Sequence, residues 1–494
     1  MMQQLLIHDA AIAYSSCSKE DGVPYRPTWA GMTGSSALYA EQPDMASGTE
    51  KSTGKFCRKQ KLQYLCSRMQ AELPQDFVRL MHEHYDKATA DGLLEALTTT
   101  EPEVSVRLNP RKLTAEELLA CRPDLERVPW CPGAFYLKER PPFTFDPLLH
   151  AGAYYVQEAA SMYISEALRT LSNSPLKGEN SLPLREGWGG SALLALDLCA
   201  APGGKSTLLE SLLPEGSLLI SNEPNAKRNK ILSENMQKWT TGLPEEAPKV
   251  IVTQRYPHEF GSLTGSVDIL LTDVPCSGEG MFRKDEGAIR EWSLENVRMC
   301  QQRQRDILAD IWHVLKPGGL LVYSTCTFNR YEDEDNARWI CDELGGTLLH
   351  ERHFLPGRDR GEGFYVAAIR SLPGSLSPNP SPVGEGSIAA QSPLFFTRGM
   401  GRSISPSPTG EGWGEAFPID LTYTQALSYL RREALRIEAP RGPVTLRYRG
   451  LVLGPGKSVG SRINNLYPEA WRIRTTYLTP FSLLDMVEDT LDTP

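Results

Sequence analysis

Five short apolar runs separated by helical stretches constrain the fold of this chain more than any other feature. Short buried strands that alternate with helices are typical of a doubly wound α/β sheet, whose ligand crevice lies at the carboxyl ends of the strands. A notable intervening helix is expected over residues 291–315. The expected strands are residues 193–198, 218–221, 250–253, 269–272 and 320–324.

The composition argues against a membrane or secreted protein. No apolar run approaches the ~20 residues of a membrane span, and the first residues lack the basic segment and apolar core of a signal peptide. The ten cysteines follow no regular spacing, which favours a reducing compartment. We therefore expect a cytoplasmic protein with no membrane contact.

The net charge of −9 conceals a basic C-terminal segment. Residues 426–474 hold ten Lys or Arg against three Glu. A local basic excess, rather than the total charge, is what a phosphate backbone experiences. A solvated charged face is the alternative, but Tyr448, Tyr467 and Trp471 lie among these charges. Because aromatic rings stack on unpaired bases, the segment favours RNA as a partner.

A glycine-rich turn follows the first expected strand, and a helix is expected after it from Ser206. Glycines at such a turn let a ligand approach the backbone amides. A phosphate-binding P-loop requires glycine at position 199, which is cysteine, and the G-x-G-x-x-G dinucleotide fingerprint is missing. A different nucleotide-like cofactor and a turn that only packs remain open. The turn residues are Cys199, Ala200, Ala201, Pro202, Gly203, Gly204 and Lys205.

Glu223 favours the cofactor interpretation. It follows the second expected strand about 20 residues after the turn, where a carboxylate can accept hydrogen bonds from ribose hydroxyls. Taken alone, an acidic residue there is often just a helix cap. Together with the turn, Glu223 indicates an adenosine-containing cofactor without a pyrophosphate, and S-adenosylmethionine fits that description.

Two cysteines follow the fourth and fifth expected strands. Cys276 ends the motif DVPC, and Cys326 ends the motif STC. Because the carboxyl ends of the strands line the crevice, both thiols are expected to face it. Free cysteines are usually buried apolar residues, but these two have polar, Gly- and Pro-rich neighbours. Neither a CxxC pair nor a histidine at ligand spacing supports zinc, so we expect no metal.

These motifs resemble those of the Sun-type RNA cytosine-5 methyltransferases, and most closely the bacterial ribosomal RNA small-subunit methyltransferase F branch. The resemblance covers residues 70–370 and 420–476, with further matches in SVRLN, YYVQE and GEGF. It implies an α/β fold with a Rossmann-like S-adenosylmethionine-dependent methyltransferase domain, a small N-terminal α+β domain and a C-terminal PUA-like RNA-binding domain.

The resemblance and the composition together predict the domain boundaries. Residues 1–68, rich in Ser, Gly and Thr, are expected to be disordered or a non-native extension, with Met69 as an alternative start to Met1. A helix is expected to open at residues 73–77. The expected segments after the extension are an N-terminal RNA-binding domain (69–149), a methyltransferase domain (150–371, insert 172–191), a low-complexity linker (372–418) and the PUA-like domain (419–494).

The resemblance also implies a mechanism. Carbon-5 of cytosine is a poor nucleophile, so the Cys326 thiolate would add to carbon-6 and activate carbon-5 toward the cofactor methyl group. Asp273 would hydrogen-bond the base at N3 and its amino group. Cys276 would assist removal of the carbon-5 proton, which lets Cys326 leave. Lys205 would lie near the thiolate and the cofactor, and a solvated lysine at the start of the helix is the alternative.

Cofactor contacts are implied for residues 199–205, Glu223 and Asp273, the last at the methionine end. One position departs from the family pattern. Many members carry an Asp just before Pro257 that holds the adenine amino group, and this chain has Tyr256. The tyrosine either stacks on the adenine or leaves the contact to the backbone.

The leading hypothesis is methylation of carbon-5 of a cytosine in RNA, with 16S ribosomal RNA as the substrate. A tRNA substrate would use the same chemistry. A non-catalytic RNA-binding ribosome-assembly factor is a different class, but loss of either cysteine would be its signature and both are present. DNA cytosine methylation is disfavoured. In the DNA cytosine methyltransferase family the nucleophile lies on the Pro-Cys loop after the fourth strand, and this chain has a second cysteine, Cys326, available instead.

Overall fold

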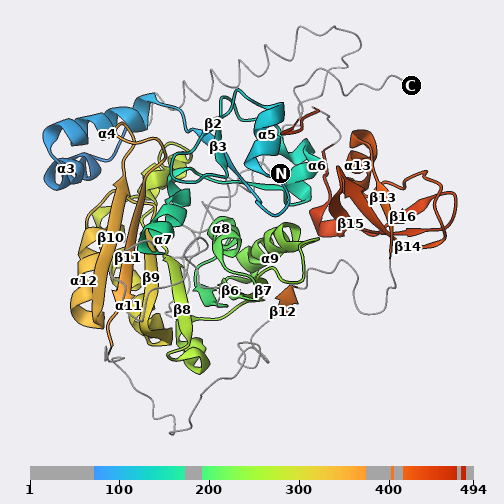
Figure 1. Cartoon of the computed structure of the whole chain (residues 1–494). Helices are drawn as coiled ribbons and strands as arrows, with labels where there is room; N and C mark the ends of the chain where they lie inside the picture. The colour runs from blue at the N-terminus through green and yellow to red at the C-terminus, as the bar shows by residue number, and fades with distance from the viewer. Residues whose placement is uncertain (1–71, 173–191, 374–401, 405–415, 476–479, 485–494) are drawn as a thin grey trace, which may run out of the picture.

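The structure is a computed structural model, and it describes residues 72–172, 192–373, 402–404, 416–475 and 480–484 (Figure 1). Three sheets follow one another along the described chain. The expected extension at 1–68, nearly all of the insert at 172–191 and most of the linker at 372–418 lie outside the described residues. None of the helices that the structure describes is long and apolar enough to cross a membrane.

The N-terminal part consists of a helical hairpin and a four-stranded sheet of order β2-β3-β1-β4. The hairpin is α3 (Gln75–His84) and α4 (Lys87–Thr99), and the Asp86 side chain caps α4 by accepting a hydrogen bond from the Thr89 amide. Since β4 belongs to this sheet, the sheet extends beyond residue 149, where the domain was expected to end. The remaining elements are β1 (Val104–Leu108), α5 (Ala115–Cys121), β2 (Glu126–Arg127), β3 (Ala134–Leu137), α6 (Pro147–His150) and β4 (Tyr154–Val156).

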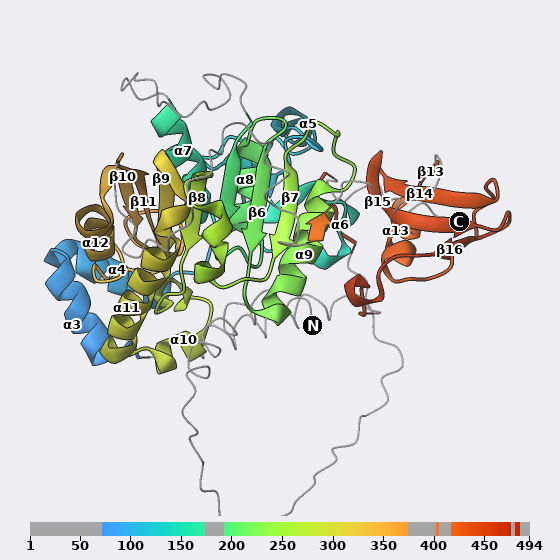
Figure 2. The same cartoon turned by 90° about the horizontal axis from the view of Figure 1, so that it is seen from below.

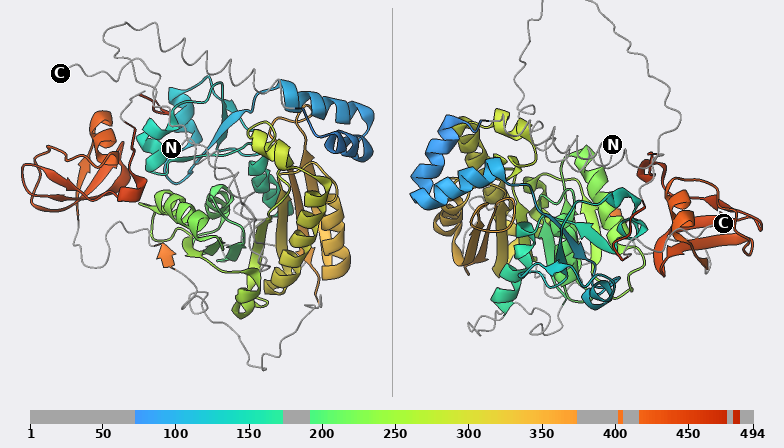
Figure 3. Two further views of the ribbon diagram at one scale, coloured as in Figure 1. Left: turned by 180° about the vertical axis from the view of Figure 1, so that it is seen from behind. Right: turned by 90° about the horizontal axis from the view of Figure 1, so that it is seen from above.

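The helical hairpin packs on the segments that carry the two cysteines rather than on its own sheet, beside α10 and α11 (Figures 2 and 3). The buried ring of Phe77 lies 5.0 Å from the ring of Phe282 and 6.4 Å from that of Phe328, centroid to centroid. Phe282 follows Cys276 and Phe328 follows Cys326. The Tyr85 hydroxyl also donates a hydrogen bond to the Phe328 carbonyl at 2.5 Å. The hairpin therefore covers both cysteine loops.

Replacing Phe77 with alanine is expected to lower the free energy of unfolding by about 3–5 kcal/mol, because it leaves a cavity in this core. Thermal and urea unfolding of the variant would measure the loss. Gln75→Ala, an exposed change on the same helix, is the control and should leave the stability near that of the parent. Equal stability of the two variants would show that the hairpin does not share a core with the loops.

The central sheet has eight strands in the order β10-β11-β9-β8-β5-β6-β7-β12. Strands β5 to β9 are parallel, and β10, β11 and β12 pair antiparallel at the two sides. The five expected strands are confirmed, and β12 forms within the expected linker. The strands are β5 (Leu194–Asp197), β6 (Leu218–Asn222), β7 (Lys249–Thr253), β8 (Val267–Asp273), β9 (Leu315–Thr325), β10 (Gly346–Phe354), β11 (Phe364–Ser371) and β12 (Arg402–Ile404).

Helices cover both faces of the central sheet. Alternate strand residues enter different cores: Ala195 packs with α8 and α9, whereas Leu194 and Leu196 pack with α11 and α12. This alternation is the doubly wound arrangement, which brings the carboxyl ends of β5, β6, β8 and β9 to one edge. The helices are α7 (Ile164–Ser172), α8 (Gly204–Leu212), α9 (Ala226–Thr240), α10 (Glu286–Glu291), α11 (Leu294–Ile311) and α12 (Glu334–Leu344).

The C-terminal sheet has the order β13-β14-β15-β16 and packs against the N-terminal part through α6 (Figure 1). The two parts share one apolar core. Asp146 joins them, since its carboxylate accepts hydrogen bonds from the Tyr154 hydroxyl and the Leu483 amide, both at 2.8 Å. The elements are β13 (Phe417–Asp420), α13 (Tyr423–Leu430), β14 (Gly442–Tyr448), β15 (Leu451–Ser458) and β16 (Ile463–Asn465).

The aromatic residues of the basic segment do not all have the expected role. Tyr448 and Tyr467 are buried in the shared core, so they cannot stack on a base, and this expectation was wrong. Trp471 is partly buried, and the Lys238 ammonium lies 5.4 Å from its ring centroid. The charges, in contrast, face solvent: eight of the ten Lys and Arg between residues 426 and 474 are exposed.

Candidate active site

The glycine-rich turn connects β5 to α8. Gly203 has φ 116°, a conformation that favours glycine, and α8 begins directly after it at Gly204, two residues earlier than expected. The first amides of the helix have no carbonyl partner one turn back, so they are available to a ligand. The Ser206 hydroxyl donates a hydrogen bond of 2.6 Å to Asp197, which fixes the end of β5 against the helix.

Asp197 leaves one buried carboxylate oxygen with no hydrogen-bond partner in the part of the chain that the structure describes. The side chain is fully buried, and this burial raises the pKa of Asp197 to about 7. An unpaired buried oxygen is costly unless a donor completes it. A donor group on a ligand bound at the turn would supply that partner.

Glu223 lies beside the turn, at the end of β6. Its carboxylate accepts a hydrogen bond of 2.9 Å from the Asn225 amide and lies 3.2 Å from the Arg228 guanidinium. The same guanidinium donates to the Ala201 carbonyl at 2.9 Å, which joins Glu223 to the turn. Burial raises the pKa of Glu223 despite the arginine. Each carboxylate oxygen keeps a second lone pair, so Glu223 can still accept a ligand hydroxyl.

Asp273 and Lys205 form an ion pair at the carboxyl end of β8. The Lys205 ammonium donates to one carboxylate oxygen at 2.8 Å, and the Ser324 hydroxyl donates to the other at 3.0 Å. The Lys205 side chain is 19% exposed, so it is not the solvated lysine of the alternative interpretation. Burial lowers the pKa of Lys205, but Asp273, Cys326 and Asp197 together raise it, and the net shift is upward. The Lys205 ammonium therefore stays charged at neutral pH.

The two thiols lie in direct contact. The sulfurs of Cys276 and Cys326 are 3.2 Å apart, within reach of an S–H···S hydrogen bond. This contact and burial raise the pKa of Cys276 well above its ordinary value. At neutral pH Cys276 is accordingly a neutral thiol, able to donate its proton toward the sulfur of Cys326.

Tyr256 is 52% exposed, and its ring lies parallel to that of His258 with the centroids 6.0 Å apart. It follows Arg255, whose backbone is bonded to the Asn222 side chain at the end of β6. The tyrosine thus lies on a loop anchored next to Glu223, with much of its ring accessible.

Among the described residues, one group could bring three metal ligands together: Asp333, Glu334 and His353. The imidazole lies between the carboxylates, with Nε2 3.4 Å from Asp333 and Nδ1 3.2 Å from Glu334. One ion can bind only one of these ring nitrogens while the other still faces a carboxylate. The geometry is that of an imidazole bridging two carboxyl groups, and it gives no reason to assign a metal.

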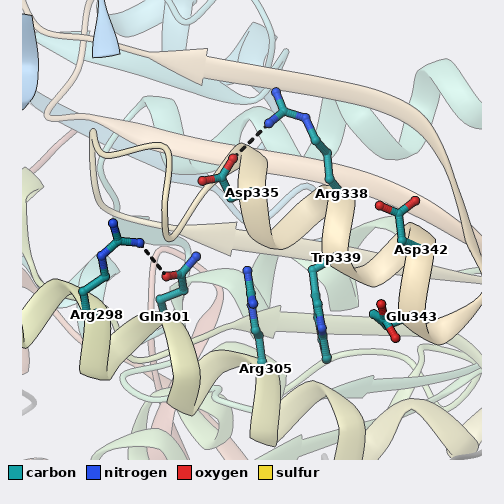
Figure 4. A pocket seen from close by; sticks show the side chains of 8 residues that line it. All are labelled: Arg298, Gln301, Arg305, Asp335, Arg338, Trp339, Asp342 and Glu343. Carbon is teal, nitrogen blue, oxygen red and sulfur yellow. Dashed lines mark hydrogen bonds and ion pairs between the residues drawn. The ribbon is translucent and has the colours of Figure 1, made fainter. Parts of the chain in front are cut away.

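A surface pocket of about 450 Å³ lies between α11 and α12 (Figure 4). Arg338 donates to Asp335 at 2.9 Å in an ion pair, and Arg298 donates to the Gln301 side chain at 3.3 Å. Neither cysteine nor any residue of the turn lines it. The residues lining it are Arg298, Gln301, Arg305, Asp335, Arg338, Trp339, Asp342 and Glu343.

Three residues close to the cysteines are not singled out by the sequence motifs. Glu279, Asn329 and Glu332 are fully buried between the two cysteine loops. Their signal in the sequence is weak: each follows a cysteine by three or six residues within a polar segment of loop composition. Such acidic and amide residues would ordinarily be assigned to a solvated loop.

Comparisons with known proteins match three parts of the chain. A family model described as 16S rRNA methyltransferase RsmB/F matches residues 191–370. Models described as the N-terminal domain of 16S rRNA methyltransferase RsmF and as the methyltransferase RsmF PUA domain match residues 73–159 and 416–473. The three matches confirm the fold class: a methyltransferase domain flanked by a small N-terminal domain and a PUA domain.

Solved structures support the fold. A methyltransferase homolog protein from Pyrococcus horikoshii is 24% identical with a TM-score of 0.50, covering 63% of this chain and 99% of that chain. NSun6 from the same organism, solved with SFG, is 17% identical with a TM-score of 0.50, covering 61% and 98%.

Sequence relatives decide the family. The ribosomal RNA small subunit methyltransferase F of Cronobacter sakazakii is 30% identical over 378 residues, which cover 70% of this chain and 73% of the relative. The protein of the same name from Aeromonas salmonicida is 28% identical over 450 residues, which cover 74% and 90%. The chain belongs to the ribosomal RNA small subunit methyltransferase F family.

Proposed function

We propose that the chain transfers a methyl group from S-adenosylmethionine to carbon-5 of a cytosine in 16S ribosomal RNA. The observation that carries this proposal is the contact between two thiols, 3.2 Å apart, beside the Lys205–Asp273 pair. One sulfur must bond to the base and a second group must assist its release, and a pair of thiols in one site provides both. A ribosomal RNA substrate also implies a cytoplasmic location.

The residues of the turn fit S-adenosylmethionine. Glu223 would accept the ribose hydroxyls, the turn from Cys199 to Lys205 would contact the cofactor through its backbone, and Asp273 would meet the methionine end. The unpaired Asp197 oxygen offers an acceptor at the same place. When bound, the cofactor supplies an electrophilic methyl group.

The first chemical step falls to Cys326. Its thiolate adds to carbon-6, forming a C–S bond and moving the ring electrons to carbon-5, which becomes nucleophilic. Asp273 accepts hydrogen bonds from the base amino group and from N3, which takes a proton from solvent when the thiolate adds and returns it on release. Lys205 holds the Asp273 carboxylate in place for this contact. The contact with Cys326 and burial raise the pKa of Cys276, so Cys276 can donate a hydrogen bond to the sulfur of Cys326.

Release follows methylation. The proton on carbon-5 passes to solvent water with the assistance of Cys276, the electrons of that C–H bond restore the ring double bond, and the C–S bond breaks. Cys326 returns as a thiolate and the methylated RNA is free. Without this step the protein would stay covalently attached to its substrate.

We infer that the exposed arginines and lysines of the C-terminal domain hold the RNA backbone. Arg436, Arg441 and Arg462 are among these exposed side chains. Binding of this kind depends on phosphate charge and falls with rising salt. The N-terminal domain, which shares a core with the C-terminal one, would extend the same RNA surface.

The substrate can be identified with labelled methyl groups. The purified full chain would be incubated with labelled S-adenosylmethionine and, separately, 16S ribosomal RNA, small ribosomal subunits and tRNA, and the products digested to nucleosides. Label in 5-methylcytidine from the ribosomal samples is expected. Label from tRNA alone would select the tRNA alternative, and no label in any sample would favour the assembly-factor alternative.

Glu223→Gln is expected to weaken binding of S-adenosylhomocysteine by about 10-fold or more, since a hydrogen bond to a charged acceptor contributes about 1.5–3 kcal/mol. Isothermal titration calorimetry without RNA would measure this change. Glu215→Gln, an exposed change of the same charge in the same domain, should bind as the parent does. Equal affinities of the two variants would remove Glu223 from the cofactor site.

A further inference from the structure

Two buried carboxylates cross between the loops that carry the cysteines. Glu279 belongs to the loop of Cys276, and Glu332 belongs to the loop of Cys326. Both side chains are fully buried. Each carboxylate accepts hydrogen bonds from the backbone of the opposite loop, and we call this arrangement the crossed brace.

The Glu279 carboxylate holds the loop of Cys326. One of its oxygens accepts hydrogen bonds from the backbone amides of Phe328 at 2.6 Å and Asn329 at 3.0 Å. The other oxygen accepts from the indole of Trp292 at 3.0 Å. Because the Trp292 side chain is buried in the core under the helical hairpin, Glu279 is fixed in orientation.

The Glu332 carboxylate holds the loop of Cys276. It accepts a hydrogen bond of 3.0 Å from the amide of Ser277, the residue directly after Cys276. It also accepts one of 2.7 Å from the Gln304 amide group, which in turn donates to the Pro275 carbonyl at 3.0 Å. Both neighbours of Cys276 in the chain are therefore bonded, directly or through Gln304, to a residue of the other loop.

Asn329 joins the two carboxylates. Its amide group donates to Glu279 at 3.0 Å and to Glu332 at 2.9 Å. Burial and the charge of Glu279 raise the pKa of Glu332 to about 7. Burying two carboxyl groups side by side costs free energy that an apolar core would not. A positional requirement at the cysteines accounts for that cost.

We propose that Glu279 and Glu332 are positioning residues that set the separation of the two sulfurs, so that one base meets both thiols. The proposal rests on the roles given to the cysteines under the proposed function. Reacting groups must be held within about 0.5 Å of the productive geometry. Each carboxylate is hydrogen-bonded to the backbone of the other loop, within three residues of the cysteine on that loop. Over so short a stretch of chain, the position of the hydrogen-bonded backbone sets the position of the cysteine.

The sulfur separation can be measured without RNA or cofactor. Diamide oxidises two thiols to a disulfide: each sulfur loses a proton, an S–S bond forms, and diamide takes up the two electrons and two protons as its hydrazine. A disulfide requires an S–S distance of about 2.05 Å. The rate at which the peptide crosslinked through Cys276 and Cys326 appears, followed by mass spectrometry, therefore reports how closely the sulfurs approach.

Glu279→Gln and Glu332→Gln are each expected to slow this crosslink by about 10–100-fold. Electrostatics alone would act in the opposite direction for Glu332, because its charge helps to raise the pKa of Cys276 and its removal would favour the thiolate. A slower crosslink thus reports geometry. The control is Glu291→Gln, an exposed change of equal charge, which should crosslink at the parent rate.

In methyl transfer, the same two variants should show a lower kcat with an unchanged KM for RNA. A crosslinking rate equal to that of the parent in both variants would overturn the proposal, whatever their activity. If crosslinking is slowed in the variants but the parent chain itself methylates no RNA, the proposed function is overturned and the crossed brace still stands. If a glutamine variant does not fold, Asn329→Ala replaces it, with an expected slowing of about threefold.

Discussion

Cys326→Ala is expected to lower methyl transfer to RNA by about 10⁴–10⁶-fold, as when a covalent nucleophile is removed. Cys326 is the sulfur proposed to bond to carbon-6, and the neighbouring Cys276 is not expected to replace it, because burial still raises the pKa of the Cys276 thiol in the variant. Transfer of labelled methyl groups under single-turnover conditions would measure the loss.

The matched control is Cys341→Ala, which removes a half-buried thiol of α12. It should methylate at the parent rate. The Cys326 variant should still bind S-adenosylhomocysteine, since Glu223 and the turn are untouched. Full methyl transfer by Cys326→Ala would contradict the assignment of Cys326 as the nucleophile. Methyl transfer by Cys326→Ala that is lost when Cys276 is also replaced would contradict it as well.

Asp273→Asn is expected to lower methyl transfer by about 10²–10³-fold, the loss typical of one electrostatic contact made in the transition state. The neutral amide cannot stabilise a base that takes a proton on N3. It also leaves the Lys205 ammonium without the carboxylate that now lies 2.8 Å away. Both effects act on the chemical step, so kcat should fall while the KM for RNA changes little.

Asp268→Asn is the control for this prediction, because Asp268 lies on the same strand and forms its own ion pair with Lys316 at 2.6 Å, distant from the thiols. Equal activity of the two variants would remove Asp273 from the reaction. A variant with an unchanged kcat and a raised KM would place Asp273 in RNA binding alone.

Much of the fold could be predicted from the sequence because the signals are local. The apolar runs that became β5 to β9 are short and bounded by turns, and Gly203 stands where the backbone needs a positive φ. The family resemblance added the domain order, which the comparisons confirm.

What could not be predicted depends on contacts between distant segments. Glu279 and Glu332 look like loop residues in sequence, and only the pairing of β8 with β9 brings their loops face to face. Tyr448 and Tyr467 were expected on an RNA surface, but the docking of the C-terminal sheet on α6 buries them. The position of the α3–α4 hairpin over both cysteine loops likewise has no local signal.

The central claim, that Cys326 bonds to the base and Cys276 releases it, is tested most directly by trapping the intermediate. Cys276→Ala protein would be incubated with S-adenosylmethionine and 16S ribosomal RNA and run on a denaturing gel. We expect a band shifted by covalently bound RNA that is absent from the Cys276→Ala, Cys326→Ala double variant. No shifted band with Cys276→Ala, or one that survives in the double variant, would contradict the claim.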